Sequence, residues 1–418
     1  MKSSNISIRK NDSLFYSLSV FLNLDIQRGV FVLYLLQIGI TQSEIGVLQS
    51  ILFFSCMLLE VPSGLMADKY GRKITIIFGF VGLALSGCGF ILFSTFLPFA
   101  ILFFLFGASI AMGSGSDRAL LYDNLLSEGR EKEYPRILST ARAVGAISLG
   151  ISMFIGGVIQ DTWSWNGVYL MFAASKVIGA IVVVFIPEMR ISAEGVLSED
   201  GKSVSIKHSG GVLHSLVSFF RSKRGGYLIP LFIGYALFEL STIPLFIYGQ
   251  PFFLEKGLSI PFIAGVYASI EVVSALMFMM ASGICSKYSL GVIGAITTVI
   301  ATMLLYVLSL DVGMILSIVV FLLIMSLPSI YEVSYENFIH ENVDSHIRAS
   351  CLSLANLFNS VIIGISYIAF GSLLERYGFS VTLLIVAAVC VSSVAGLVIT
   401  LLNNEKIVVT SLQKSSEK

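Results

Sequence analysis

The chain has 418 residues, of which 56% are hydrophobic and 12% charged, and its formal net charge is zero. A water-soluble protein of this length could not bury so much apolar surface, so an ordinary soluble domain is excluded. The balanced charge gives no reason to expect a nucleic-acid partner. We therefore expect an integral membrane protein whose main surroundings are the lipid bilayer.

Twelve segments are apolar enough, over the roughly 20 residues that a bilayer requires, to cross a membrane. Backbone polar groups in lipid must be satisfied within the segment, so we expect each segment to be an α-helix. The first lacks a small-residue cleavage site, which favours a retained helix over a cleaved signal. The segments are 13–37, 44–67, 73–95, 97–121, 136–160, 166–187, 227–249, 259–285, 289–309, 312–337, 347–372 and 378–402.

The predicted fold class is an all-α integral membrane protein whose twelve helices form two pseudo-symmetric six-helix bundles. Weak internal repeats support two halves, because Tyr122-Asp123-Asn124-Leu125 recurs as Tyr335-Glu336-Asn337-Phe338 at an offset of about half the chain. Lys and Arg gather at both termini and in alternate loops, which predicts that both termini are cytoplasmic. We expect an N-terminal half over 1–187, a cytoplasmic linker over 188–225, a C-terminal half over 226–403 and a cytoplasmic tail over 404–418.

One short segment, residues 64–73, joins the second and third predicted helices. We expect a tight loop there, with glycine where the backbone turns or approaches a neighbour closely and with basic residues facing headgroups. The segment resembles the signature loop of the major facilitator superfamily, written G-x-x-x-D-x-x-G-R-K. Every fixed position of that pattern is present, as Gly64, Asp68, Gly71, Arg72 and Lys73.

The resemblance implies a secondary transporter of the major facilitator fold that moves a small molecule by alternating access. It also implies a monomer in the cell's inner membrane. In the superfamily an acid at the cytoplasmic end of helix 4 pairs with the signature-loop arginine, which points to Asp123 with Arg72. The resemblance further implies that the Asp68 carboxylate interacts with the N-terminus of a helix in the second half and so holds the loop against it. Glu336, which mirrors Asp123 in the repeat, is expected to be a gate residue as well.

Ionisable groups at bilayer depth are costly unless paired or hydrated, so they are candidates for function. Asp25 and Arg28 lie near the middle of the first segment, at a spacing that places both on one helix face. They either form a structural ion pair, or Asp25 titrates beside the arginine, an arrangement that resembles proton-coupled multidrug exporters. The remaining candidates for the cavity and for proton coupling are Asp117, Arg118, Lys176, Glu239, Glu271 and Glu332.

These candidates divide by charge, since the cations lie in the first half and most acids in the second. The division predicts an amphoteric cavity suited to a zwitterion, a modified peptide or a cationic amphiphile. Glu239 and Glu271 are expected to be protonated or paired across the cavity with Arg28, Arg118 or Lys176. Glu60 either titrates or bonds to a neighbouring helix, and Arg142 either faces inward or extends its charge toward water.

The family patterns in helices 4 and 5 are incomplete. The arginine that precedes a glycine pair in helix 4 is missing, and helix 5 lacks its proline. Helix 5 keeps glycines that permit close helix packing, namely Gly145, Gly150, Gly156 and Gly157.

The leading functional hypothesis is export of a small organic compound, such as a drug, a peptide antibiotic or a siderophore, in exchange for protons. The second is proton-coupled import of a nutrient, and a third is a receptor without transport. We expect no enzymatic activity, metal or cofactor, because the sequence shows no nucleophile–base set, metal-ligand cluster or phosphate loop.

Overall fold

The computed structural model describes residues 2–188, 228–343 and 345–416, and this part of the chain is helical, with no strand. It separates into two compact units. The first comprises residues 1–204 together with 253–272, and the second comprises 205–252 and 273–418. The predicted linker lies almost entirely outside the described residues.

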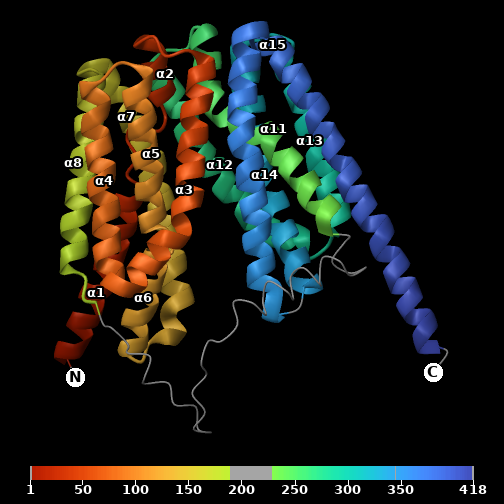
Figure 1. Ribbon diagram of the computed structural model, residues 1–418, viewed down its shortest axis with the longest axis horizontal. Coiled ribbons are helices and arrows are strands. Elements are labelled where there is room, and N and C mark those ends of the chain that lie inside the picture. The colour runs from red at the N-terminus through yellow and green to blue at the C-terminus, as the bar shows by residue number, and fades with distance from the viewer. Residues whose placement is uncertain (1, 189–227, 344, 417–418) are drawn as a thin grey trace. The chain divides into compact units, whose positions relative to one another are not determined.

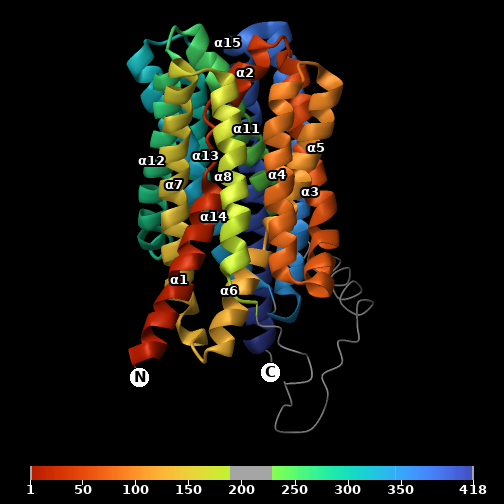
Figure 2. The same cartoon turned by 90° about the vertical axis from the view of Figure 1, so that its left-hand side faces the viewer.

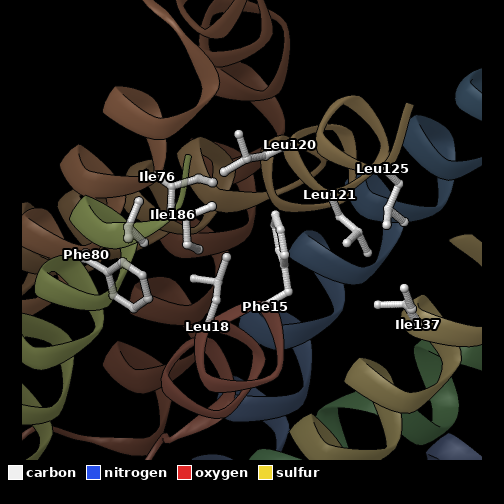
Figure 3. Close-up of a cluster of buried hydrophobic side chains, with 10 residues drawn as sticks. Phe15, Leu18, Ile76, Phe80, Leu120, Leu121, Leu125, Ile137 and Ile186 are labelled. Atoms are coloured by element: carbon white, nitrogen blue, oxygen red, sulfur yellow. The ribbon is translucent and has the colours of Figure 1, made fainter. Parts of the chain in front are cut away.

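The first unit is a helical bundle (Figures 1 and 2). Its helices are α1 (Lys2–Asn23), α2 (Phe31–Gln37), α3 (Gln42–Tyr70), α4 (Arg72–Leu92), α5 (Phe96–Gly113), α6 (Ser116–Ser127), α7 (Tyr134–Thr162) and α8 (Trp165–Phe185), with a 3-10 turn, Glu131–Glu133, before α7. Helix α1 packs against α7 and α8, while α4 packs against α5 and α8. Near the α3–α4 junction, buried side chains from α1, α4, α6 and α7 form an apolar core that includes Phe15, Phe80 and Leu121 (Figure 3).

The remaining long helices form the second unit, except for residues 253–272, which belong to the first. They are α11 (Leu228–Glu255), α12 (Ile260–Cys285), α13 (Leu290–Ser309), α14 (Met314–Asn342) and α15 (Ser345–Ser416). Helix α15 consists of two helical segments joined at Gly378 (Figure 1). Gly378 has φ 71°, a backbone conformation that glycine adopts with little strain. These two helical segments correspond to the last two predicted spans.

Ten helices of the described chain are long and apolar enough to cross a membrane. The tenth, Leu354–Ile399, contains the Gly378 turn and so covers two of the predicted segments. The remaining predicted segment, residues 13–37, is divided between α1 and α2, neither of which reaches the required length and hydropathy alone. The helix positions expected from hydropathy are therefore confirmed, with the first predicted helix interrupted near its middle and the fourth near its end.

The interruption corrects the expectation of a continuous first helix. Residues 24–30 between α1 and α2 are not helical, with turns over 26–30, so Asp25 and Arg28 do not share a helix face. Backbone hydrogen bonds in this run join residues three apart, as in Arg28 N–H to the Asp25 carbonyl (3.1 Å). The run contains Asp25 and Gly29, residue types with low helix propensity.

Small residues on α7 allow the interrupted helix to lie close. Gly145, Ser148, Ser152 and Gly156 are buried and recur at helical spacing along one face. A Cβ at Gly145 would lie 2.6 Å from Asn23 Nδ2, and one at Gly156 would lie 1.9 Å from the Ile26 carbonyl oxygen. The close packing expected of the helix 5 glycines is thus present at Gly145 and Gly156 but not at Gly150, and Gly156 admits the non-helical segment.

We expect Gly156→Ala to destabilise the protein, because the added methyl group meets a backbone carbonyl rather than a flexible side chain. Purified protein should lose several degrees of thermal stability, whereas Gly150→Ala should shift it little. A Cβ at Gly150 meets the Ala268 carbonyl oxygen only at 3.5 Å, an ordinary contact, so it is a matched control. Equal unfolding temperatures for both variants would contradict this account of the packing.

The signature segment is also different from the loop that its composition predicts. Helix α3 continues to Tyr70 and α4 begins at Arg72, so only Gly71 is non-helical. Gly71 has φ 111°, which disfavours any residue with a side chain, and its carbonyl accepts a hydrogen bond from the Thr75 hydroxyl (3.0 Å). Gly64 is helical with no atom within 4 Å of its Cβ position, so neither a turn nor a close approach explains it in the described chain.

Candidate functional site

The end of α1 packs against α7 and α8 (Figure 2). A helix that stops inside a membrane leaves carbonyls without intrahelical partners, and these need other donors. The buried Lys176 ammonium donates to the Phe21 and Leu22 carbonyls (3.0 and 3.3 Å). The Ser148 and Ser175 hydroxyls donate to the Val20 (3.1 Å) and Leu24 (3.4 Å) carbonyls.

The backbone carbonyls at the end of α1 are thus the hydrogen-bond partners of Lys176, and the sequence did not indicate them. Its side chain is 2% exposed, and the ammonium also lies 5.1 Å from the centre of the Phe172 ring. A cation at the C-terminal end of a helix interacts favourably with the helix dipole as well as with the carbonyl oxygens. Lys176 therefore stabilises the interruption of the first helix from within the α1–α8 interface.

Asp25 lies half-buried in the interrupted segment. One carboxylate oxygen accepts a hydrogen bond from Gln27 Nε2 (2.8 Å), and the backbone N–H donates to the Ser152 hydroxyl (3.1 Å). Arg28 lies on the same segment, close enough to Glu271 of α12 for their charges to interact. The structure thus brings Arg28 toward Glu271, one of the pairings that the sequence left open.

A second carboxyl network lies in the second unit, around Glu239 of α11. The Tyr235 hydroxyl donates to Glu239 Oε1 (2.9 Å), and Asn359 Nδ2 of α15 donates to Glu239 Oε2 (2.5 Å). The Tyr235 ring stacks on Tyr335 of α14 at a centroid distance of 4.1 Å. Both of these hydrogen-bond partners of Glu239 are neutral, so the carboxyl can gain or lose a proton without breaking an ion pair with them. Tyr235 and Asn359 were not among the sequence candidates.

The other acids lie in more exposed positions. Glu332 and Glu336 are exposed on α14, and Glu332 is near enough to Glu239 for their charges to interact. Glu60 is exposed on α3. None of these three forms an ion pair in the described part of the chain.

The expected contact between Arg72 and Asp123 is present. Arg72 Nη1 donates to the Asp123 carboxylate and to the Ala119 carbonyl, both on α6. The neighbouring Lys73 ammonium donates to the Ile186 carbonyl (2.9 Å) at the end of α8. The start of α4 is therefore attached to two other helices, whereas Asp68 is exposed on the last turn of α3.

We predict that Arg72→Gln and Asp123→Asn each lower the transport rate by about ten-fold and that the double variant is no slower than either. The pair is partly exposed, so the effect on unfolding should be small, about 1 kcal/mol or less. Initial rates, corrected for the amount of protein in the membrane, measure the effect. Lys69→Gln is the control, because Lys69 lies in the same segment but contacts the Tyr70 ring rather than α6. Additive losses in the double variant would show that the two residues act separately.

Asp117 and Arg118 lie where the fourth predicted span is interrupted. Helix α5 ends at Gly113, and α6 begins at Ser116 after Gly115, whose φ is 78°. Together with Arg142 of α7, the two residues line a pocket of about 280 Å³ within the first unit. Arg142, one of the open alternatives from sequence, therefore faces this pocket.

Arg130, between α6 and α7, makes a network that sequence analysis missed. Its guanidinium donates to both Asp12 carboxylate oxygens (3.1 and 2.9 Å), to Glu133 and to Glu128. Hydrogen bonds to Glu133 and Asp12 raise the pKa of Arg130 above its ordinary value. The network joins α1 to the connection before α7. The only signal in the sequence is the dense charge of residues 128–133.

Comparisons with known proteins agree with this architecture. The chain resembles the crystal structure of the nucleoside transporter NupG, with a TM-score of 0.77 and 16% identity over 94% of this chain and 99% of that one. It also resembles the crystal structure of a D-xylose-proton symporter, with a TM-score of 0.70 and 14% identity over 94% of this chain and 97% of the other. At such identities the likeness concerns the fold alone.

A curated relative from Methanocaldococcus jannaschii, described as an uncharacterized MFS-type transporter, is 26% identical over 156 residues. The match covers 37% of this chain and spans 39% of that relative's length. The family model described as Major Facilitator Superfamily matches residues 14–367, most of the chain. The chain therefore belongs to the major facilitator superfamily and is a multi-pass membrane protein with that superfamily's all-helical fold.

Proposed function

We propose that this protein exports a small organic compound in exchange for protons. The observation that carries the proposal is that each unit holds a half-buried carboxyl that accepts hydrogen bonds from neutral side chains: Asp25 in the first and Glu239 in the second. Ionisable groups in such positions are costly, and in transporters they mark proton and substrate pathways.

The two networks suit proton exchange for different reasons. Asp25 lies on a non-helical segment, whose backbone is held by side chains and can rearrange more readily than a continuous helix. Glu239 is bonded to a hydroxyl and an amide, groups that tolerate both protonation states of a carboxyl. Alternating access would then expose these acids to one side at a time, with the Arg72–Asp123 contact holding the signature segment against α6.

Import by proton symport is the second candidate. The observation that favours it is the structural likeness to a D-xylose-proton symporter. The same acids serve either direction, because direction depends on the order in which proton and substrate bind and not on the residue type. A location in the inner membrane, cytoplasmic termini and a monomeric state remain part of the proposal.

Everted bacterial membrane vesicles with an acidified interior would decide the direction. A panel of drugs, peptides, siderophores and nutrients is added, and a pH-sensitive dye reports proton release from the vesicle. We expect some compounds to release protons in wild-type vesicles but not with Asp25→Asn. Asp161→Asn, an exposed acid at the end of α7, is the control.

Import would instead appear as acid-driven accumulation of a compound in right-side-out vesicles. That result, without proton release in everted vesicles, would overturn export. Transport that runs equally well with and without a pH gradient in both orientations would overturn proton coupling altogether.

A further inference from the structure

The pocket between α1, α6 and α7 has a definite chemical character. Its walls come from one unit, and most of them are apolar, formed by Phe15, Leu18, Leu22, Leu121 and Leu138. Three of these side chains also belong to the buried core near the signature segment (Figure 3). The polar groups are concentrated in Ser19, Asp117, Arg118 and Arg142. The pocket thus combines an apolar surface with a compact charged end.

The charged end has an excess of positive charge. Two guanidinium groups face one carboxylate, and the contact between Arg118 Nε and Asp117 Oδ1 is 4.0 Å, too long for a hydrogen bond. Asp117 lies in the first turn of α6, where the helix dipole already favours a negative charge. Neither the Arg118 nor the Arg142 guanidinium makes a hydrogen bond within the described residues. Their donors are therefore available to another anion.

We infer that this pocket binds the carboxylate of a small amphiphilic compound and that such compounds are the substrate class of the proposed transporter. Two planar guanidinium groups match the geometry of a carboxylate, and the apolar wall accommodates the rest of the compound. A volume of about 280 Å³ is at the lower limit of ordinary ligand sites, so the compound is small. This inference rests on the proposed function and narrows the amphoteric cavity expected from the sequence.

The pocket is also directly connected to the signature-segment contact. Arg118 precedes Ala119, whose carbonyl accepts a hydrogen bond from Arg72, and Asp123 follows about one turn later on the same helix. Helix α6 is separated from α5 by the Ser114–Gly115 break. A carboxylate bound to Arg118 would therefore act on the short helix that holds Arg72.

The test uses purified full-length protein in a neutral detergent and the fluorescent probe N-dansylglycine, with its methyl ester as the uncharged control. Fluorescence titration should show the carboxylate binding at least about ten-fold more tightly than the ester. Arg118→Gln and Arg142→Gln should each weaken carboxylate binding by about ten-fold, and Arg118→Lys by less, because the charge remains. Arg136→Gln, an exposed arginine on α7 outside the pocket, should leave binding unchanged.

Thermal unfolding of each variant checks that the protein is folded. Equal affinity for the acid and the ester, or unchanged affinity in the folded Arg118→Gln and Arg142→Gln variants, would overturn the inference. A second arm uses nanodiscs with and without phosphatidylglycerol. If that lipid blocks the probe and is retained by the wild type but not by Arg118→Gln, the ligand is a lipid phosphate and the substrate inference fails.

Failure of the site and failure of the proposed function are distinguishable. The site is tested by binding alone, in the absence of any gradient. Binding of N-dansylglycine that depends on both arginines, with no proton-coupled movement of any compound in vesicles, would leave the site standing and reject the function. Proton-coupled transport that is unchanged in the Arg118→Gln and Arg142→Gln variants would support the function and reject the site.

Discussion

Replacing Lys176 with Met is expected to lower the unfolding temperature by on the order of 5–10 °C and to reduce transport at least about ten-fold. Methionine has nearly the same length, so the main change is the loss of the ammonium group. The Phe21 and Leu22 carbonyls would then lose the donor that the structure gives them. Buried polar groups without partners cost roughly 1–3 kcal/mol each.

Transport should fall along with stability because the same ammonium group bonds the Leu22 carbonyl near the end of α1, three residues before Asp25. Thermal unfolding of the purified protein and proton release in vesicles measure the two effects. Lys176→Arg should retain more of both, since it keeps a cationic donor. Lys132→Met removes an exposed lysine from the 3-10 turn and should change neither. A Lys176→Met protein with wild-type stability would show that the carbonyls find other donors.

The second large effect is expected from Glu239→Gln. This variant should lower the rate of proton-driven transport at least about ten-fold while leaving the fold intact. Glutamine can still accept a hydrogen bond from Tyr235, but it cannot exchange a proton. Its amide nitrogen would face Asn359 Nδ2. Rotation of the Asn359 amide resolves that conflict, because its buried Oδ1 has no hydrogen-bond partner in the described chain.

This variant is best tested by comparing two kinds of transport. Accumulation against a gradient driven by pH should disappear, whereas exchange of labelled for unlabelled compound, which needs no net proton movement, should continue. Glu255→Gln changes an exposed acid at the end of the same helix α11 and is the control. Wild-type accumulation in Glu239→Gln would exclude Glu239 as a proton carrier.

The hydrogen-bond networks of Asp25 and Glu239 show what the sequence can and cannot predict about a buried acid. Asp25 and Glu239 were identified because acids are rare in apolar segments and are expensive there. Their partners were not identified, because Gln27, Tyr235 and Asn359 are ordinary polar residues, and Asn359 lies 120 residues from Glu239. The available signal for the interruption was the presence of three poor helix formers, Asn23, Asp25 and Gly29, within seven residues.

The signature segment shows how a motif can indicate a contact without indicating its backbone. The resemblance to the superfamily pointed to Arg72 with Asp123, and that contact is present. The expected loop is nearly all helix, because α3 and α4 need only Gly71 to change direction. Composition could not show this, since glycine and charged residues are equally compatible with a loop and with a helix end.

Hydropathy alone determined where the chain crosses the membrane, because a bilayer demands about 20 apolar residues whose backbone groups are satisfied within each segment. That is a local property, and it is readable from consecutive residues. Only the tertiary structure decided where a helix could stop inside the membrane. Its free carbonyls are satisfied by Ser148 and Lys176, which lie 128 and 154–155 residues away in the chain. The small residues of α7 then allow the two segments to lie close enough for those bonds to form.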